Sequence, residues 1–156
     1  MKRVLACSFI GVVVVCALAV AFAQHSDHTG RTGAESSKPE VIGAIKSARV
    51  RFVFPADGAT VPQTFKAKFE VEGLKIAKAG TMEPGTGHFH IIIDKPAVKE
   101  GEPIPFDDNH LHFGNGDTEA ELKLSPGKHT LTLQFADGAH RAYGGNLVQT
   151  ITVTVK

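Results

Sequence analysis

The sequence predicts an all-β fold, an immunoglobulin-like antiparallel β-sandwich of about seven strands. Apolar and polar residues alternate over short segments, the two-residue period of strands with one buried face. Clusters of Gly, Pro, Asn and Asp separate these segments at the short intervals typical of sandwiches. No segment shows the period of a convincing helix. The chain lacks Trp, and both cysteines precede residue 17, so the comparison with immunoglobulins concerns architecture and not the antibody core residues.

Residues 1–23 have the features of a signal peptide. A basic start, Met1–Arg3, precedes the apolar run Val4–Val20, and Ala21–Ala23 is a small-x-small cleavage site. Cleavage after Ala23 predicts a periplasmic or secreted protein with no membrane segment in its mature form. The alternative is a retained anchor, because the apolar run is close to the length that spans a bilayer.

Composition excludes several classes of function. Cys7 and Cys16 lie in the leader, so the exported chain has no thiolate for a Cys-type zinc or blue-copper site. The formal net charge is +1 and basic residues are scattered, so nucleic acid is not an expected partner. One Tyr and no Trp argue against an aromatic sugar-binding platform.

Residues 24–46 are predicted to be a flexible linker, because they are polar, contain Gly and Ser, and lack periodicity. The sandwich domain is expected over residues 47–156. The apolar residues that alternate with polar ones are expected to face the core: Val50, Phe52 and Phe54; Phe65, Ala67, Phe69 and Val71; Phe89, Ile91 and Ile93; Ala120, Leu122 and Leu124; Leu131, Leu133 and Phe135; Leu147, Ile151, Val153 and Val155. Residues 110–113 add a short strand, and long loops are expected over 74–87, 95–109 and 136–146.

Two His-x-His pairs are the candidate metal ligands: His88 with His90, and His110 with His112. Residues i and i+2 of a strand point to the same face, so each pair presents two imidazoles side by side. Four imidazoles that converge would suit a zinc or copper ion. The alternative is that these are ordinary exposed or hydrogen-bonded histidines, and the sequence leaves both interpretations open.

Three further residues are possible additional ligands or supports for the ligands. Met82 carries the only thioether after the leader and would favour copper. Asp94 continues the histidine face of its strand and could orient a ring. His140 lies in a glycine-containing loop, where nothing in the spacing requires it to be a ligand. His129, at the start of a strand, is expected to cap or pack.

Three segments resemble a bacterial secreted family catalogued as domain of unknown function 4399. The segments are residues 80–94, 109–114 and 125–131, and the resemblance extends over about Val50 to Val155. It implies a periplasmic or extracellular β-rich domain and brings no catalytic residue. The seven residues Met82, His88, His90, His110, His112, His129 and His140 fall within the family's motif blocks.

The favoured function is therefore an exported domain that binds copper or zinc and buffers, delivers or senses the ion. The alternative is an envelope module, structural or protein-binding, that contacts another envelope protein without a metal. A metal-dependent enzyme is the least favoured class, because a catalytic metal needs an open coordination position and a general base, and the sequence indicates neither. No nucleophile elbow and no phosphate-binding glycine loop occurs in the sequence, which argues against other hydrolytic and nucleotide-binding classes.

Overall fold

The computed structural model describes residues 38–156. The expected leader and most of the expected linker lie outside the described residues. Within the described part of the chain, no helix is both long enough and apolar enough to cross a membrane.

Helix α1 (Lys38–Ser47) occupies the end of the segment 24–46 that was expected to be a flexible linker, and there the expectation is wrong. Glu40 in its first turn and Lys46 in its last turn complement the helix dipole. Ile45 packs against the main core. Ten residues form at best a marginal helix alone, so this tertiary contact explains why local composition did not reveal it.

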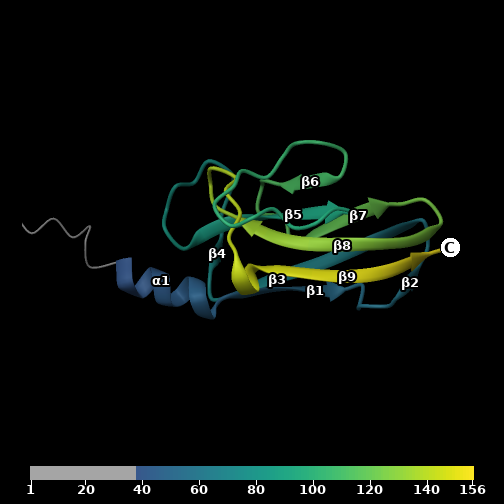
Figure 1. Ribbon diagram of the computed structural model, residues 1–156, viewed down its shortest axis with the longest axis horizontal. Helices are drawn as coiled ribbons and strands as arrows, with labels where there is room; N and C mark the ends of the chain where they lie inside the picture. Colours follow the sequence, from purple (N-terminus) through teal and green to yellow (C-terminus); the bar gives the residue numbers. More distant parts are fainter. Residues whose placement is uncertain (1–37) are drawn as a thin grey trace, which may run out of the picture. The chain divides into compact units, whose positions relative to one another are not determined.

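The strands form two sheets (Figure 1), which confirms the predicted immunoglobulin-like β-sandwich. One sheet has the order β1-β3-β7, and the other has the order β2-β9-β8-β5-β4, with β6 also paired to β5. The strands are β1 (Arg49–Phe54), β2 (Thr60–Val61), β3 (Thr64–Glu72), β4 (Lys75–Ile76), β5 (Thr86–Ile93), β6 (His110–Phe113), β7 (Glu119–Lys123), β8 (Gly127–Ala136) and β9 (Val148–Val155). A 3-10 turn, η1 (Gly145–Leu147), precedes β9.

Strand pairing is antiparallel except at the two-residue strands β2 and β4, which pair in parallel with β9 and β5. Strand β4 lies in the segment 74–87 that was expected to be a loop, and β2 lies in a segment for which no element was predicted. The seven longer strands coincide with the predicted ones. In β5, Phe89 pairs with Phe135 of β8 on one side and with Phe113 of β6 on the other. The register therefore aligns apolar residues in rows.

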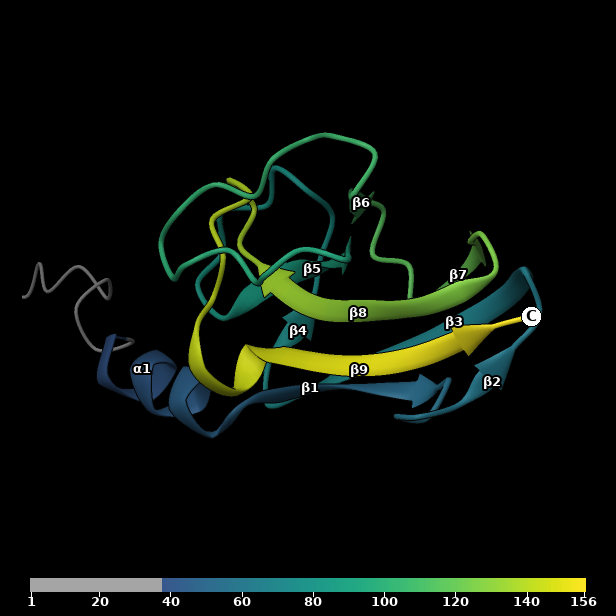
Figure 2. The same cartoon turned by 45° about the vertical axis from the view of Figure 1, so that its right-hand side comes forward.

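The main core lies between the two sheets (Figure 2). Phe69 of β3 meets Phe89 of β5 edge to face, with ring centroids 4.8 Å apart. Ile91, Leu133 and other alternate residues of β5 and β8 are fully buried beside them. Each such side chain contributes about 1.5–3 kcal/mol to folding through burial.

The outer face of the β1-β3-β7 sheet is covered by exposed ion pairs between neighbouring strands. Such pairs contribute only about 0.2–1 kcal/mol each, so this face adds solubility more than stability. The pairs are Arg49–Glu72, Arg51–Glu70, Lys66–Glu119 and Lys68–Glu119.

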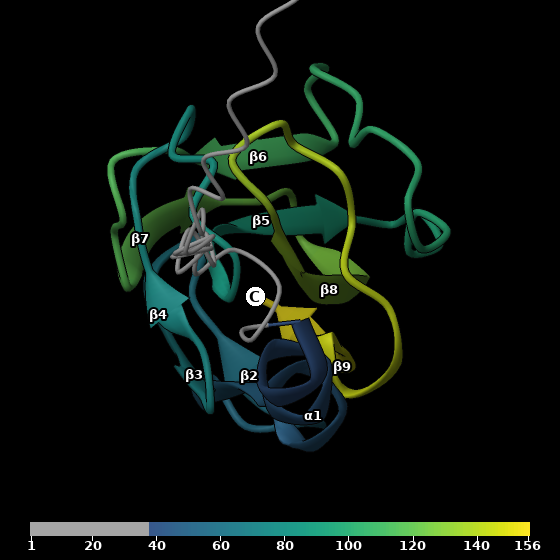
Figure 3. The same ribbon diagram turned by 90° about the vertical axis from the view of Figure 1, so that its left-hand side faces the viewer.

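Long loops cover the outer face of the other sheet, as seen on the side of β5 and β8 away from β1 and β3 (Figures 1 and 3). The Gln134 amide on β8 anchors the 95–109 loop: its Oε1 accepts the Val98 N–H at 3.0 Å and its Nε2 donates to the Val98 carbonyl at 2.7 Å. Ile104 from this loop packs with Ala136 in a second small core. Every residue of β5 is consequently buried, on both faces of the strand.

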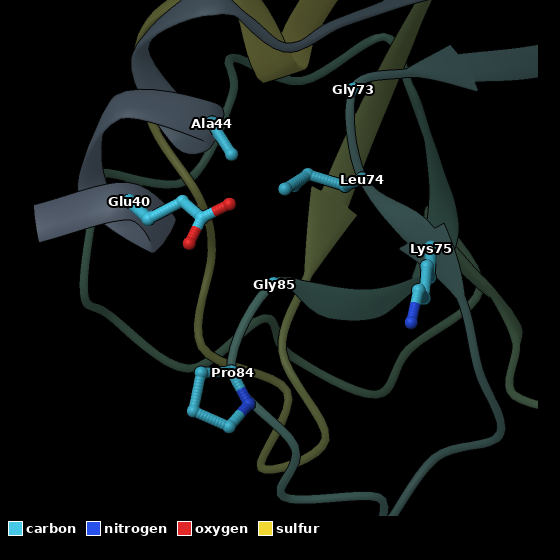
Figure 4. A pocket seen from close by; sticks show the side chains of 7 residues that line it. All are labelled: Glu40, Ala44, Gly73, Leu74, Lys75, Pro84 and Gly85. Atoms are coloured by element: carbon cyan, nitrogen blue, oxygen red, sulfur yellow. The ribbon is translucent and has the colours of Figure 1, made fainter. Parts of the chain in front are cut away.

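A hollow of about 280 Å³ lies between α1 and the chain around β4 (Figure 4). Glu40 and Ala44 of the helix face Leu74 across it. Among residues 38–156, no histidine lines this hollow. It is therefore separate from the residues with candidate metal chemistry.

Candidate metal centre

Four histidine rings gather on the loop-covered face of the larger sheet. His88 and His90 come from β5, and His112 comes from β6, where it pairs directly with His90. His140 reaches them from the loop that joins β8 to η1. The six distances between their ring centroids run from 4.8 to 5.9 Å. All four rings therefore surround one small volume.

The ring nitrogens, and not only the rings, face one another. The Nε2 atoms of His88 and His90 are 3.1 Å apart, and those of His112 and His140 are also 3.1 Å apart. One ligand nitrogen from each of His88, His90 and His112 lies within 4.8 Å of the other two. This convergence is the geometry that a shared ion requires.

Burial differs sharply between the inner and the outer rings. His88 and His90 are 0% exposed, whereas His112 is open to solvent. The Nδ1 atoms of both inner rings have no hydrogen-bond partner among the described residues. A buried polar group left unpaired costs about 1–3 kcal/mol, and such a group calls for a specific explanation, such as a bound ion or water.

The electrostatics of the cluster favour uncharged rings. Burial, with the charge of neighbouring imidazoles, lowers the pKa of His88 to about 4. The same causes, in the same order, lower the pKa of His90 to about 3. Burial also lowers the pKa of His112, and His140 adds to the effect. Neutral imidazole is the form that binds metal, so the folded chain presents these rings ready for an ion at neutral pH.

The backbone holds His140 in the left-handed region, at φ 63°. Such a conformation costs of order 1–3 kcal/mol for a residue with a side chain. Hydrogen bonds fix it: the His140 N–H donates to the Asp137 carbonyl at 2.9 Å, and its carbonyl accepts from the Ile104 N–H at 2.9 Å. The Asp137 carboxylate also accepts the backbone N–H groups of Ala139 and Arg141. The loop is thus built to hold this strained residue.

Two glycines allow the loops to approach the cluster closely. A Cβ on Gly114 would lie 2.5 Å from Nε2 of His112 and 3.1 Å from Cβ of Ala79. A Cβ on Gly138 would lie 1.9 Å from the carbonyl oxygen of Thr81. A side chain at Gly138 would meet backbone, and one at Gly114 would displace the His112 ring, so both glycines help to set where His112 and His140 lie.

Phe106 covers the two outer histidines. Its ring centroid lies 5.2 Å from that of His112 and 5.1 Å from that of His140, both in edge-to-face geometry. The Phe106 side chain is itself 66% exposed. Beside it, His112 lines an open hollow of about 430 Å³ together with Lys78 and Asp117. The cluster thus has a closed inner side and an outer side near solvent.

His110, predicted to belong with the other three histidines, lies apart from the cluster. The register places it opposite Ile92, about 6.6 Å along the strand from His112 at the usual rise per residue. Its Nδ1 is 2.7 Å from Oδ1 of Asp107. It is also not among the histidines whose ligand nitrogens converge within 4.8 Å. His140 is not in that group of three either, but its Nε2 lies 3.1 Å from Nε2 of His112, and its ring centroid lies 4.8–5.9 Å from those of the three strand histidines.

Asp94 forms its hydrogen bonds outside the cluster, and Met82 is largely exposed. The Asp94 carboxylate accepts the Thr130 N–H at 2.8 Å and lies 2.6 Å from Nδ1 of His129. Asp94 therefore orients His129 and not a ring of the cluster, and His129 also donates from Nε2 to the Ser125 carbonyl at 3.0 Å. Met82 is 67% exposed and lies in the loop whose Thr81 touches Gly138.

No spacing in the sequence points to His140 or to Phe106 as part of the site. The segment Asp137–Gly138 indicates a turn, but only the three-dimensional path of the loop brings His140 to the strand histidines. The burial of His88 and His90 was equally invisible, because it depends on the loops that cover β5.

Comparison with known families identifies one family, whose description carries no activity. The family described as domain of unknown function (DUF4399) matches residues 67–156, which confirms the family resemblance, although the match begins after β1. No curated protein sequence matches significantly.

The solved structures that match the chain include two at low identity. An endo-beta-1,4-mannanase from Thermotoga petrophila is 18% identical, with a TM-score of 0.41 over 72% of this chain and 20% of that chain. The fibronectin(III)-like modules of CbhA from Clostridium thermocellum are 13% identical, with a TM-score of 0.38 over 69% of this chain and 95% of that chain. The chain thus spans about a fifth of the length of the mannanase structure.

Proposed function

Since the chain belongs to the family described as domain of unknown function (DUF4399), we propose a function from the histidine cluster itself. The domain binds one zinc or copper ion through His88, His90 and His112. The observation that carries the proposal is the convergence of one nitrogen from each of these residues to within 4.8 Å of the others.

The ligand chemistry supports zinc or copper over other ions. Imidazole nitrogen suits zinc, copper and nickel, whereas magnesium and calcium require oxygen ligands. At metal–nitrogen distances of about 2.0–2.1 Å, neighbouring ligand nitrogens are about 2.9 Å apart in a square-planar site and about 3.3 Å apart in a tetrahedral one. The separation of 3.1 Å between Nε2 of His88 and Nε2 of His90 lies between these values, so this pair already has the spacing of two ligands of one ion. The nitrogen of His112, within 4.8 Å of both, would move closer as the ion binds.

The burial of His88 and His90 also supports a role beyond folding. Apolar side chains on this face of β5 would pack under the loops without unpaired nitrogens, as Ile92 does. Two buried imidazoles are therefore a cost to stability. A bound ion would turn this cost into a gain, because metal binding free energy adds to folding free energy.

The proposal includes export and a role in buffering, delivering or sensing the ion. The features of residues 1–23 support export, and the lack of cysteine after Cys16 means that oxidation of thiols would not affect the site. The N-terminal sequence of the protein recovered from the periplasm or medium checks this part. Gln24 is the expected first residue, and a chain retained in the membrane with Met1 intact would contradict it.

Metal uptake by the purified protein tests the binding proposal. The wild type is expected to take up one zinc or copper ion per chain, and a variant with His88, His90 and His112 changed to alanine is expected to take up none. His110→Ala is the matched control, since His110 lies on the same strand as His112 but bonds to Asp107; it should bind as the wild type does.

A second measurement guards against a variant that fails to fold. A ligand that binds only the folded state raises its stability by about 2.7 kcal/mol at a hundred times the dissociation constant. Zinc should therefore raise the melting temperature of the wild type and of His110→Ala. A wild-type melting temperature and metal content that zinc and copper leave unchanged would overturn the proposal and favour a metal-free envelope interaction module.

A further inference from the structure

His140 enters the cluster in a way that distinguishes it from the three strand histidines. His88, His90 and His112 are held by the paired strands β5 and β6, whereas His140 is held by a loop at φ 63°. Strain of this kind persists only where surrounding structure imposes it, and it is concentrated at functional sites. The hydrogen bonds from Asp137 and Ile104 supply that structure.

The spacing of the four rings agrees better with tetrahedral than with planar coordination. If each ring centroid lies about 3.2 Å from the ion, a tetrahedral site gives six centroid separations of about 5.2 Å, and a square-planar site gives four of about 4.5 Å and two of about 6.4 Å. Five of the observed separations fall between 4.8 and 5.0 Å, and the sixth is 5.9 Å. The rings are thus spread nearly evenly around one point.

Phe106 lies where an ion would enter or leave. The inner rings His88 and His90 are fully buried, so the open side of the cluster is the pair His112 and His140. Phe106 packs edge to face on both of these rings. An apolar side chain in this position limits the access of water to the site.

We infer that His140 is the fourth ligand of a closed tetrahedral site and that Phe106 is its cap, which slows the release of the ion. This inference rests on the proposed metal-binding function. A closed four-ligand site without an open position is the arrangement of zinc sites that hold the ion and not of those that catalyse. In this arrangement the strand histidines bind the ion first, and His140 and Phe106 slow its release.

Cobalt(II) is the probe for coordination number, because a tetrahedral cobalt site absorbs visible light much more strongly than a site with five or six ligands. The test variant is His140→Gly, since glycine accepts a φ of 63° without strain. Phe106→Ala tests the cap, and His110→Ala is the control. The same four proteins, loaded with zinc, are mixed with an excess of chelator to measure the rate of zinc release.

The wild type and His110→Ala are expected to show the strong tetrahedral spectrum and slow release. His140→Gly should still take up one cobalt ion, lose most of the absorption, and release zinc at least about tenfold faster. Phe106→Ala should keep the strong spectrum and release zinc faster than the wild type.

Other outcomes contradict separate parts of the reasoning. A wild-type spectrum typical of five or six ligands, or a His140→Gly variant with the wild-type spectrum and release rate, would overturn the assignment of His140. An unchanged rate of zinc release in Phe106→Ala would contradict the role of Phe106 as a cap. Absence of cobalt, zinc and copper uptake by the wild type would instead contradict the proposed function on which the inference rests.

Discussion

A single methyl group added at Gly114 should weaken metal binding without unfolding the domain. Gly114 follows β6 directly and is not among the glycines with positive φ, so its backbone accepts alanine. The added Cβ would lie 2.3 Å from Cε1 and 2.5 Å from Nε2 of His112. Ordinary contacts of a Cβ begin near 3.4 Å, so the ring must retreat by about 1 Å.

This displacement exceeds what a metal site tolerates. Metal–ligand distances lie within about 0.2 Å of their usual values, so a ring moved by about 1 Å no longer binds the ion. We expect zinc affinity to fall by about 10- to 100-fold, equivalent to roughly 1.4–2.8 kcal/mol. His112 is exposed and can swing outward, so the free energy of unfolding without metal should change by less than about 1 kcal/mol.

Competition titration with a chromogenic chelator measures the affinity, and urea unfolding without metal measures the stability. Gly43→Ala in α1 is the matched control, because its added Cβ meets no atom within 4 Å. It should leave zinc affinity unchanged and raise stability slightly, through the higher helix propensity of alanine. Wild-type affinity in Gly114→Ala would refute the placement of His112 in the site.

Three further predictions concern stability and its pH dependence. Gly87→Ala should lower the free energy of unfolding by about 1–3 kcal/mol or more, because the added Cβ would lie 2.3 Å from the Ala136 carbonyl oxygen; an unchanged urea midpoint would contradict this packing. Gln134→Leu removes both hydrogen bonds to Val98, so it should cost about 1–3 kcal/mol and expose residues 95–109 to protease, and an equally resistant loop would argue against the anchor. His129→Gln should destabilise the domain by about 1 kcal/mol, and more at pH 5.5 than at pH 8.5. Its hydrogen bond to Asp94 raises the pKa of His129 above its usual 6.5, so the stabilisation is fully present below pH 6.5 and is lost as pH rises through the raised value. Burial alone would raise the pKa of Asp94, but the hydrogen bonds from His129 and Thr130 lower it below 3.8. Asp94 is therefore still ionised at pH 5.5, and the charged pair with His129 persists. Thermal unfolding at the two pH values, with equal losses at both, would exclude the charged pair.

The sandwich could be predicted from the sequence because each strand is specified by the alternation of apolar and polar residues within its own segment. In β3, Phe65, Ala67 and Phe69 alternate with charged residues, and this period alone specifies a strand and its inward face. Helix α1 could not be predicted in the same way. It is short, and the contact of Ile45 with the core that supports it exists only after the sheets have formed.

Only the part of the candidate site that lies on strands could be predicted from the sequence. The period of two correctly puts His88 and His90 on one face of β5, and pairing with β6 adds His112. The register between β5 and β6 decides which histidine of the second pair joins them. It places His112 opposite His90 and His110 opposite Ile92, two residues further along β5. The choice of His140 depends on the path of a loop with an unusual backbone conformation, for which no periodicity exists.

The ion-paired face of the β1-β3-β7 sheet offers a practical way to follow the site. It lies across the core from the histidines, and its side chains are solvated and contribute little to stability. The chain after Cys16 has no thiol, so Lys66→Cys in a protein that begins at Gln24 would provide a single attachment point for a fluorophore. Quenching of that fluorophore by bound copper would report occupancy from a distance, without a label near the loops that cover the cluster.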